Sequence, residues 1–123
     1  MASVFTRIIE GEIPAYKIYE DEKTIAFLDI DPKAEGHTLV VPKIEIDKFY
    51  ELPEEYYVAV FDTAKRLAAH FDKVLGKRVF LKVIGTDVPH VHIHLIPQIE
   101  DYPQKPALEE ADFVRVSDLL RYA

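Results

Sequence analysis

The chain has 123 residues, of which 22 are acidic and 15 basic, with a net charge of −7, five histidines and no cysteine. The lack of cysteine excludes a disulfide framework, thiol catalysis and cysteine-liganded zinc, and the acidic balance argues against binding to a nucleic-acid polymer. No apolar run reaches the ~20 residues that a membrane span needs, so we expect one cytoplasmic domain over residues 1–123 that binds no membrane and no nucleic-acid polymer.

The N-terminal half is predicted to hold one short helix and three strands. Ser3 can cap a short helix with an apolar side, and the stretch from Gly11 to Pro14 ends it. Three runs rich in β-branched and aromatic residues predict strands: Tyr16–Tyr19, Thr24–Leu28 and His37–Val41. A hairpin turn joins the first two runs, and a polar loop over Asp29–Gly36 leads to the third.

The C-terminal half is predicted to hold a long helix followed by two strands. After Pro53, apolar residues recur at steps of three and four. This spacing predicts an amphipathic helix of about five to six turns, with Gly76 as its C-cap. Two further strands are expected after it: Val79–Ile84 and Val91–Ile96.

The tail at residues 98–123 is predicted to be extended at first, with a short helical segment near Ser117–Tyr122. The core of the domain then covers about residues 4–97. Five strands, mostly joined by hairpins, with one long and one short helix predict an α+β fold with a largely antiparallel sheet.

Three histidines alternate with aliphatic residues in the segment PHVHIHLIPQ: His90, His92 and His94. Because the side chains of a strand alternate between its faces, we expect the imidazoles on one face and the aliphatic side chains in the core. Three interpretations are open for such a row. It can be a set of exposed surface imidazoles, a metal site, or a site for phosphoryl chemistry.

Geometry and chemistry separate these interpretations. Histidines two apart on a strand are separated by roughly 6.6 Å, so all three hardly reach a zinc ion that needs nitrogens at ~2.0–2.1 Å. A metal site would need further ligands from elsewhere in the chain. A neutral imidazole is a competent nucleophile at neutral pH, and its neighbours can donate to phosphate oxygens. The row therefore favours phosphoryl chemistry.

The run His90-Val91-His92-Ile93-His94-Leu95-Ile96 resembles the defining motif of the histidine triad family, in which three histidines alternate with apolar residues. The opening VFTRIIEGEIPAYKIYEDE and the segment TIAFLDIDPKAEGHTLVVPK resemble the family in the same order, so that the resemblance covers about residues 4–97. It implies a histidine triad fold that pairs through its sheet and long helix as a homodimer. It also implies a small-molecule nucleotide substrate, with no cofactor and no metal.

The resemblance implies a role for each matching residue. His92 is expected to be the nucleophile that forms a transient nucleotidyl-histidine, and His90 and His94 to orient it and bind phosphate oxygens. Asp29 is expected to accept hydrogen bonds from the ribose hydroxyls. The expected walls of the base pocket are apolar: Val4, Phe5, Ile8, Ile13, Phe27 and Ile30.

Several positions depart from the family's pattern. Asp87 stands where many members have a serine that donates to phosphate, and we expect it to be protonated, to face a histidine, or to act as an acid toward the leaving group. Thr86 precedes it as an expected nucleotide-binding residue in a shortened loop. Glu45 stands near the position of a family histidine. His37 is expected to support the site, whereas His70 is expected on the surface of the long helix.

Three hypotheses of function follow. The first is a hydrolase or transferase that cleaves at the α-phosphate of nucleoside phosphoramidates or dinucleoside polyphosphates through a covalent His92 intermediate, with purine nucleotides as the expected substrates. The second is a non-catalytic nucleotide sensor of the same fold. The third is a metal-dependent enzyme that uses the histidine strand. Turnover separates the first from the second, and loss of activity on chelation would favour the third.

Overall fold

A five-stranded sheet organises the computed structural model, which describes residues 2–98 and 109–122. The strand order is β1-β2-β3-β5-β4, and each neighbouring pair is antiparallel. The strands are β1 (Lys17–Glu20), β2 (Thr24–Leu28), β3 (Thr38–Pro42), β4 (Val79–Val83) and β5 (Ile93–Pro97). The helices are α1 (Val4–Ile9), α2 (Glu54–Leu75) and α3 (Glu110–Leu120), with a single 3-10 turn, η1 (Phe49–Glu51).

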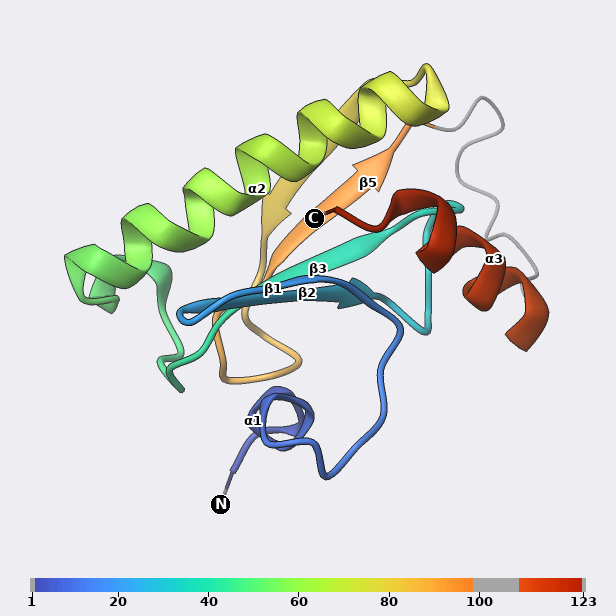
Figure 1. Ribbon diagram of the computed structural model, residues 1–123. Helices are drawn as coiled ribbons and strands as arrows, with labels where there is room; N and C mark the ends of the chain where they lie inside the picture. The colour runs from blue at the N-terminus through green and yellow to red at the C-terminus, as the bar shows by residue number, and fades with distance from the viewer. Residues whose placement is uncertain (1, 99–108, 123) are drawn as a thin grey trace.

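Helices cover both faces of the sheet (Figure 1). The long helix α2 lies across one face, where its Leu67 and Phe71 pack with Ile93 and Leu95 of β5 in the larger core. The short helix α1 lies against the opposite face, where Phe5 joins a second apolar cluster with residues of β2 and β3. Because they are covered on both sides, the central strands β2 and β3 are buried along their whole length.

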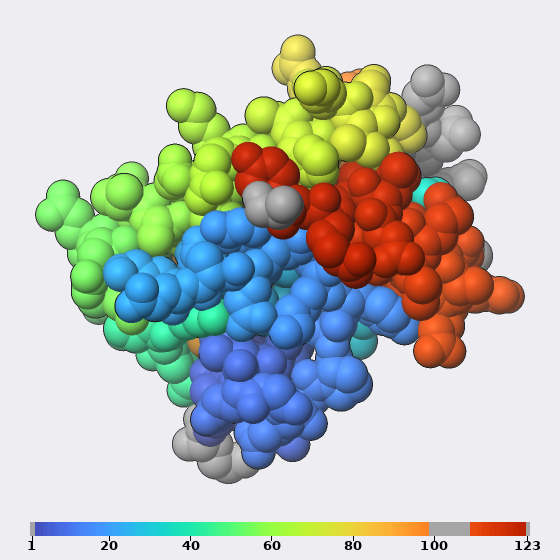
Figure 2. Space-filling model, viewed as in Figure 1, coloured from blue at the N-terminus to red at the C-terminus, as the bar shows by residue number. Residues whose placement is uncertain are grey.

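The C-terminal helix α3 fastens the loop between β2 and β3 to the rest of the fold. A capping box between Glu109 and Asp112 begins the helix, and its Arg115 bonds Glu35 of the loop at 2.9 Å. In the space-filling view, α3 lies directly against the C-terminal end of α2 (Figure 2). The loop that carries Asp29 and His37 is therefore held in place by α3, which is distant from it in the sequence.

The structure confirms the α+β class and the five-stranded antiparallel sheet. Each predicted strand is present to within two residues, and Gly76 caps α2 with a left-handed φ of 67°. The helical segment expected near Ser117–Tyr122 is the longer helix α3, so the described residues hold three α-helices. The extended start of the tail lies outside the described residues. Within residues 2–98 and 109–122, no helix is long and apolar enough to cross a membrane.

Gly36 is the residue on which α3 and the end of β5 meet the β2–β3 loop. Its φ is +95°, and a Cβ added there would lie 3.1 Å from Pro97 Cγ and 3.2 Å from Leu120 Cδ1. Gly11 has a similar φ of +81° but nothing within 4 Å of such a Cβ. The two glycines therefore share the backbone requirement and differ in the space around them.

We predict that Gly36→Ala lowers the free energy of unfolding by about 3 kcal/mol, because left-handed strain and overpacking add together. Gly11→Ala carries the strain alone and is expected to cost about 1 kcal/mol. Urea denaturation of both variants measures the difference. Equal losses at the two positions would show that packing of α3 and β5 on Gly36 contributes nothing.

Candidate functional site

A pocket of about 250 Å³ lies between α1 and the face of the sheet that α1 covers. His92, His94, Asp29 and Asp87 line it together with the six apolar residues expected to wall it: Val4, Phe5, Ile8, Ile13, Phe27 and Ile30. Three expected site residues, His90, His37 and Thr86, are not in its lining. The structure thus brings most of the predicted residues together in one cavity.

The alternation predicted that the three histidines form one row on a strand, but the structure does not have this arrangement. β5 begins at Ile93, so only His94 lies on it, while His90 and His92 precede it in irregular backbone. At those positions the backbone pairs with neither β3 nor β4, and the N–H groups of His90 and Val91 donate instead to the carbonyls of Val88 and Ile46. As a consequence, the three imidazoles have different surroundings and different hydrogen-bond partners.

His90 is fully buried, and both of its ring nitrogens are already bonded. Its Nε2 lies 2.9 Å from the carbonyl oxygen of Pro42, which can only accept, so Nε2 carries the proton. Its Nδ1 therefore accepts, and the Ser3 hydroxyl donates to it at 2.7 Å. Burial lowers the pKa of His90, so it is held as the neutral ring. In this arrangement His90 has no nitrogen left for a phosphate oxygen.

His92 has the tautomer that a nucleophile requires. Its Nδ1 donates to the carbonyl oxygen of His90 at 2.7 Å, which leaves Nε2 without a proton. Asp87 Oδ1 is 3.6 Å from this Nε2, on a side chain that is 70% exposed. The ring is also held edge-on by Phe5, with the centroids 4.8 Å apart. A backbone carbonyl thus fixes which nitrogen has the free lone pair.

His37 fixes the tautomer of His94 in a short chain of hydrogen bonds. The backbone N–H of Lys33 donates to His37 Nδ1 at 2.9 Å, so the proton of His37 is on Nε2. His37 Nε2 then donates to His94 Nδ1 at 3.0 Å, which places the His94 proton on its own Nε2. His94 therefore presents its Nε2–H donor to the pocket, whereas His92 presents an Nε2 with a free lone pair.

Both rings of this chain are neutral at physiological pH. Burial first, and then the charges of Lys82 and Lys33, lower the pKa of His37 to about 4. Burial first, and then the charges of His92, His37 and Lys82, lower the pKa of His94 to about 4. The His94 donor is thus a neutral imidazole rather than an imidazolium.

One group of side chains resembles a metal site: ligand atoms of Asp29, His37 and His94 lie within 4.8 Å of one another. The hydrogen bonds do not suit a metal there. The Lys33 N–H occupies the Nδ1 lone pair of His37, so His37 Nε2 carries a proton and offers no lone pair. Burial raises the pKa of Asp29, whose carboxylate also accepts the backbone N–H of Asp31 at 2.8 Å. The group is better described as a hydrogen-bonded support of the pocket floor.

A polar cluster, which we call the N-terminal clamp, joins α1 to the body of the fold. It consists of Ser3, Thr6, Glu45 and His90. Glu45 Oε1 accepts the backbone N–H of Ser3 at 2.6 Å and the hydroxyl of Thr6 at 2.7 Å. These two donors lower the pKa of Glu45, the Ser3 N–H most of all. The clamp therefore connects the helix that walls the pocket with the residue whose carbonyl orients His92.

Some lining residues were missed by the sequence analysis: Pro14, Ala15, Leu28, Leu39 and Val88. Leu39 lies on the same face as Phe27 because the two pair directly across β2 and β3, and only the register of the folded sheet shows this. Of the clamp residues, Ser3 was expected as a helix cap and Glu45 as a departure from the family's pattern, but neither was expected to hold α1. His70, expected on the surface, is half-buried with its ring centroid 5.1 Å from that of Tyr122.

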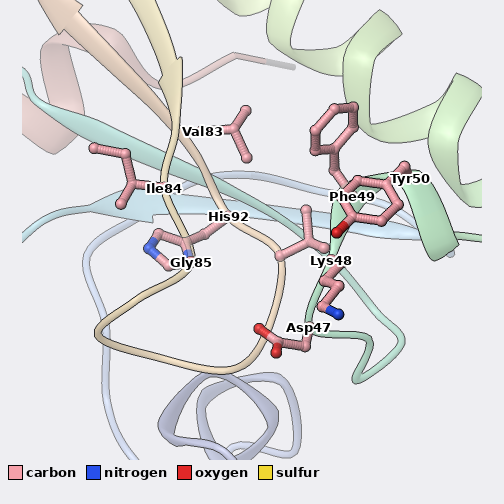
Figure 3. A pocket seen from close by; sticks show the side chains of 9 residues that line it. Asp47, Lys48, Phe49, Tyr50, Val83, Ile84, Gly85 and His92 are labelled. Carbon is pink, nitrogen blue, oxygen red and sulfur yellow. The ribbon is translucent and has the colours of Figure 1, made fainter.

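A second pocket of similar volume lies beside His92, on the side away from α1 (Figure 3). Ile84 and Gly85 form one side of it, and Phe49 and Tyr50 stand across from them. The ring of His92 lies next to Gly85 rather than between the two walls. This pocket was not predicted, and it differs from the first in the exposed aromatic residues of its lining, Phe49 and Tyr50.

Comparison with known protein families matches residues 10–101 to the HIT domain. A HIT-like protein of Methanocaldococcus jannaschii, MJ0866, is 37% identical over 127 aligned positions, which cover 96% of this chain and 95% of that protein. The adenosine 5'-monophosphoramidase HNT1 of Saccharomyces cerevisiae is 39% identical over 102 positions, covering 81% of this chain and 65% of HNT1. The crystal structure of a Hit-like protein involved in cell-cycle regulation from Bartonella henselae superposes with a TM-score of 0.88 at 27% identity, over 97% of this chain and 93% of that one.

We predict that Glu45→Ala loosens α1 and weakens nucleotide binding, because Ser3 and Thr6 lose the carboxylate that holds them. Amide hydrogen exchange over residues 3–9 is expected to speed up, and the dissociation constant for AMP to rise. Glu12→Ala is the matched control, since Glu12 is also exposed and its side chain has no partner among the described residues. Unchanged exchange in Glu45→Ala would refute the clamp.

Proposed function

Because this chain belongs to the HIT domain family, we propose that it is an enzyme that cleaves nucleotides at the α-phosphate through a covalent nucleotidyl-His92 intermediate. The observation that carries the proposal is the pair of opposite tautomers in the pocket. His92 presents a free Nε2 lone pair, while His94 presents an Nε2 proton. A phosphate placed between them meets a nucleophile and a donor, each fixed before the substrate arrives.

The pocket suggests how a nucleotide lies in it. Phe5, Phe27 and Leu39 offer apolar walls for the base. Asp29 lines the same pocket, with a carboxylate oxygen within 4.8 Å of a ring nitrogen of His94, where it can accept hydrogen bonds from the ribose hydroxyls. The α-phosphate then lies at His92 and His94. Two further expectations are part of the same proposal: a preference for a purine base, which the family resemblance implies, and a cytoplasmic location.

The reaction proceeds in two steps. His92 Nε2 attacks the α-phosphorus, the N–P bond forms, and the leaving group departs with the electrons of the broken bond. Water then attacks the phosphorus, and the N–P electrons return to Nε2 as AMP is released. The carbonyl of His90 holds the Nδ1 proton throughout and stabilises the positive charge of the nucleotidylated ring. Asp87, 3.6 Å from Nε2, is placed to exchange a proton with the leaving group or with water.

Two classes of substrate are proposed: nucleoside phosphoramidates and dinucleoside polyphosphates. The name of the yeast relative, a monophosphoramidase, supports the first class. The mechanism uses groups of the chain alone, so that neither an organic cofactor nor a metal has a step in it. Thr86 is exposed and outside the pocket lining, and its proposed nucleotide contact would be to a part of the substrate that extends from the pocket.

A homodimer is also part of the proposal. Four exposed apolar residues, which we call the aromatic patch, support it: Phe49, Tyr50, Tyr57 and Ile84. Phe49 and Tyr50 line two neighbouring hollows, and one of these continues to Ile84 next to the edge strand β4. Exposed aromatic residues beside an unpaired strand edge are typical of an interface. The expected pairing surface is thus the β4 edge together with α2.

We predict that His92→Asn abolishes a covalent adduct that the native protein forms. The protein is mixed briefly with adenosine 5'-phosphoramidate or diadenosine tetraphosphate, quenched without acid and measured by intact-protein mass spectrometry. An adenylate-sized adduct and free AMP are expected with the native chain and with the control His70→Asn. AMP release by His92→Asn would overturn the assignment, and AMP binding without turnover by the native chain would favour the sensor.

For the dimer, we predict that Tyr50→Asp converts it to a monomer, because a charge would be buried in the interface. Tyr50 is 71% exposed in the single chain, so the folding of the chain does not depend on this ring. Sedimentation velocity should give about twice the chain mass of 14.2 kDa for the native protein and for the control Val114→Asp on α3. A native protein that sediments as a monomer would contradict the proposal.

A further inference from the structure

One residue from each of four strands forms a row across the sheet. The register pairs Phe27 of β2 with Leu39 of β3, Leu39 with His94 of β5, and His94 with Lys82 of β4. Directly opposed residues of antiparallel strands point to the same face. Phe27 and Leu39 belong to the wall of the pocket, so Lys82 continues the row beyond His94, away from the base-binding end.

The Lys82 ammonium lacks a counter-ion in the part of the chain that the structure describes. It is exposed, and it has no ion-pair or hydrogen-bond partner among residues 2–98 and 109–122. Its charge nevertheless reaches the site, because it contributes to lowering the pKa of both His94 and His37. Lys33 contributes only at His37, so Lys82 is the lysine whose field is felt at both rings.

The pocket itself offers an anion little compensation. Its lining contains two carboxylates, Asp29 and Asp87, and no lysine or arginine among the residues that the structure describes. His94 and His37 are neutral, as their pKa values of about 4 require. A substrate with one phosphate can rely on neutral donors. A substrate that carries a second anionic group needs a cation, and Lys82 is the one placed next to His94.

We propose that Lys82 binds an anionic leaving group and so selects substrates whose α-phosphate is joined to a second anion. The inference rests on the proposed function and specifies its substrate class. Neighbouring strands lie about 4.7–4.9 Å apart, and a lysine side chain is long and flexible enough to reach over the neighbouring histidine. With the base over Phe27 and Leu39 and the α-phosphate at His94, the next group along the row lies at Lys82.

An exposed lysine can also be a solvated surface charge that has no part in the reaction. That role makes no distinction between substrates. The proposed role does, because removal of the ammonium affects only a substrate whose leaving group is charged. The comparison of two adenylyl substrates, one with an anionic and one with a neutral leaving group, therefore separates the two roles.

The test measures kcat/KM for AMP release from adenosine 5'-phosphosulfate, whose leaving group is sulfate, and from adenosine 5'-phosphoramidate, whose leaving group is ammonia. For Lys82→Gln we expect about a five- to tenfold loss with the phosphosulfate, the range for one partly exposed charged contact. Less than about a twofold loss is expected with the phosphoramidate. Lys82→Arg keeps the charge and is expected to retain most of the phosphosulfate activity.

Lys65→Gln, an equal change of charge at an exposed position of α2 on the other side of the sheet, should leave both activities unchanged. Equal losses on the two substrates, or none, would overturn the role of Lys82 while leaving the proposed function in place. A native protein that releases AMP from neither substrate would overturn both. NMR titration of folded Lys82→Gln should also give a higher pKa for His94 than in the native protein. An unchanged pKa would mean that the Lys82 ammonium does not approach His94.

Discussion

The backbone carbonyl of His90 accepts the Nδ1 proton of His92 at 2.7 Å, and the chemistry of the pocket depends on this contact. A free imidazole exchanges its proton between two nitrogens, whereas a ring held against a carbonyl keeps one lone pair in one direction. The carbonyl is in turn fixed because the His90 side chain is bonded on both nitrogens, to Pro42 and to Ser3. The orientation of His92, the proposed nucleophile, thus depends on the loop and on α1 together.

The electrostatics of the site follow from burial rather than from charge. His37 and His94 are neutral because their surroundings are poor in water, and their order of donation starts from a backbone N–H that cannot reverse. Such a fixed set of dipoles stabilises developing charge without having to reorganise. Because these rings are neutral, we propose that the few formal charges near the pocket, those of Asp29, Asp87 and Lys82, select the substrates.

Much of the fold could be read from the sequence because its signals were local. The β-branched run of β2, the apolar spacing of α2 and the glycine at its end each predict an element without reference to the rest of the chain. The pocket walls on α1 and β2 were identified from the family resemblance, and the structure places them together. Local signals could not predict where β5 begins, because strand alternation continues through His90 and His92 although their backbone has no partner strand.

The tautomers, the clamp and Lys82 could not be predicted for a different reason. The tautomer of His94 and the clamp depend on groups from distant parts of the sequence, such as His37 with His94, and the place of Lys82 opposite His94 depends on strand pairing. An exposed lysine on a strand has no sequence signal that separates it from any surface lysine. Only the register of the folded sheet shows that Lys82 lies opposite His94.

The clamp also has a consequence for the order of events during synthesis. Ser3 bonds residues 42 and 87 positions further along the chain. At about 5–20 residues per second, on the order of 4–17 s pass between the emergence of Ser3 and that of His90 from the ribosome. For that time α1, which is too short to be stable alone, lacks its contact with His90, although the β2 and β3 residues on which Phe5 packs have already emerged. The hydrogen bond between Ser3 and His90 can therefore form only after the strands β1 to β4 have emerged.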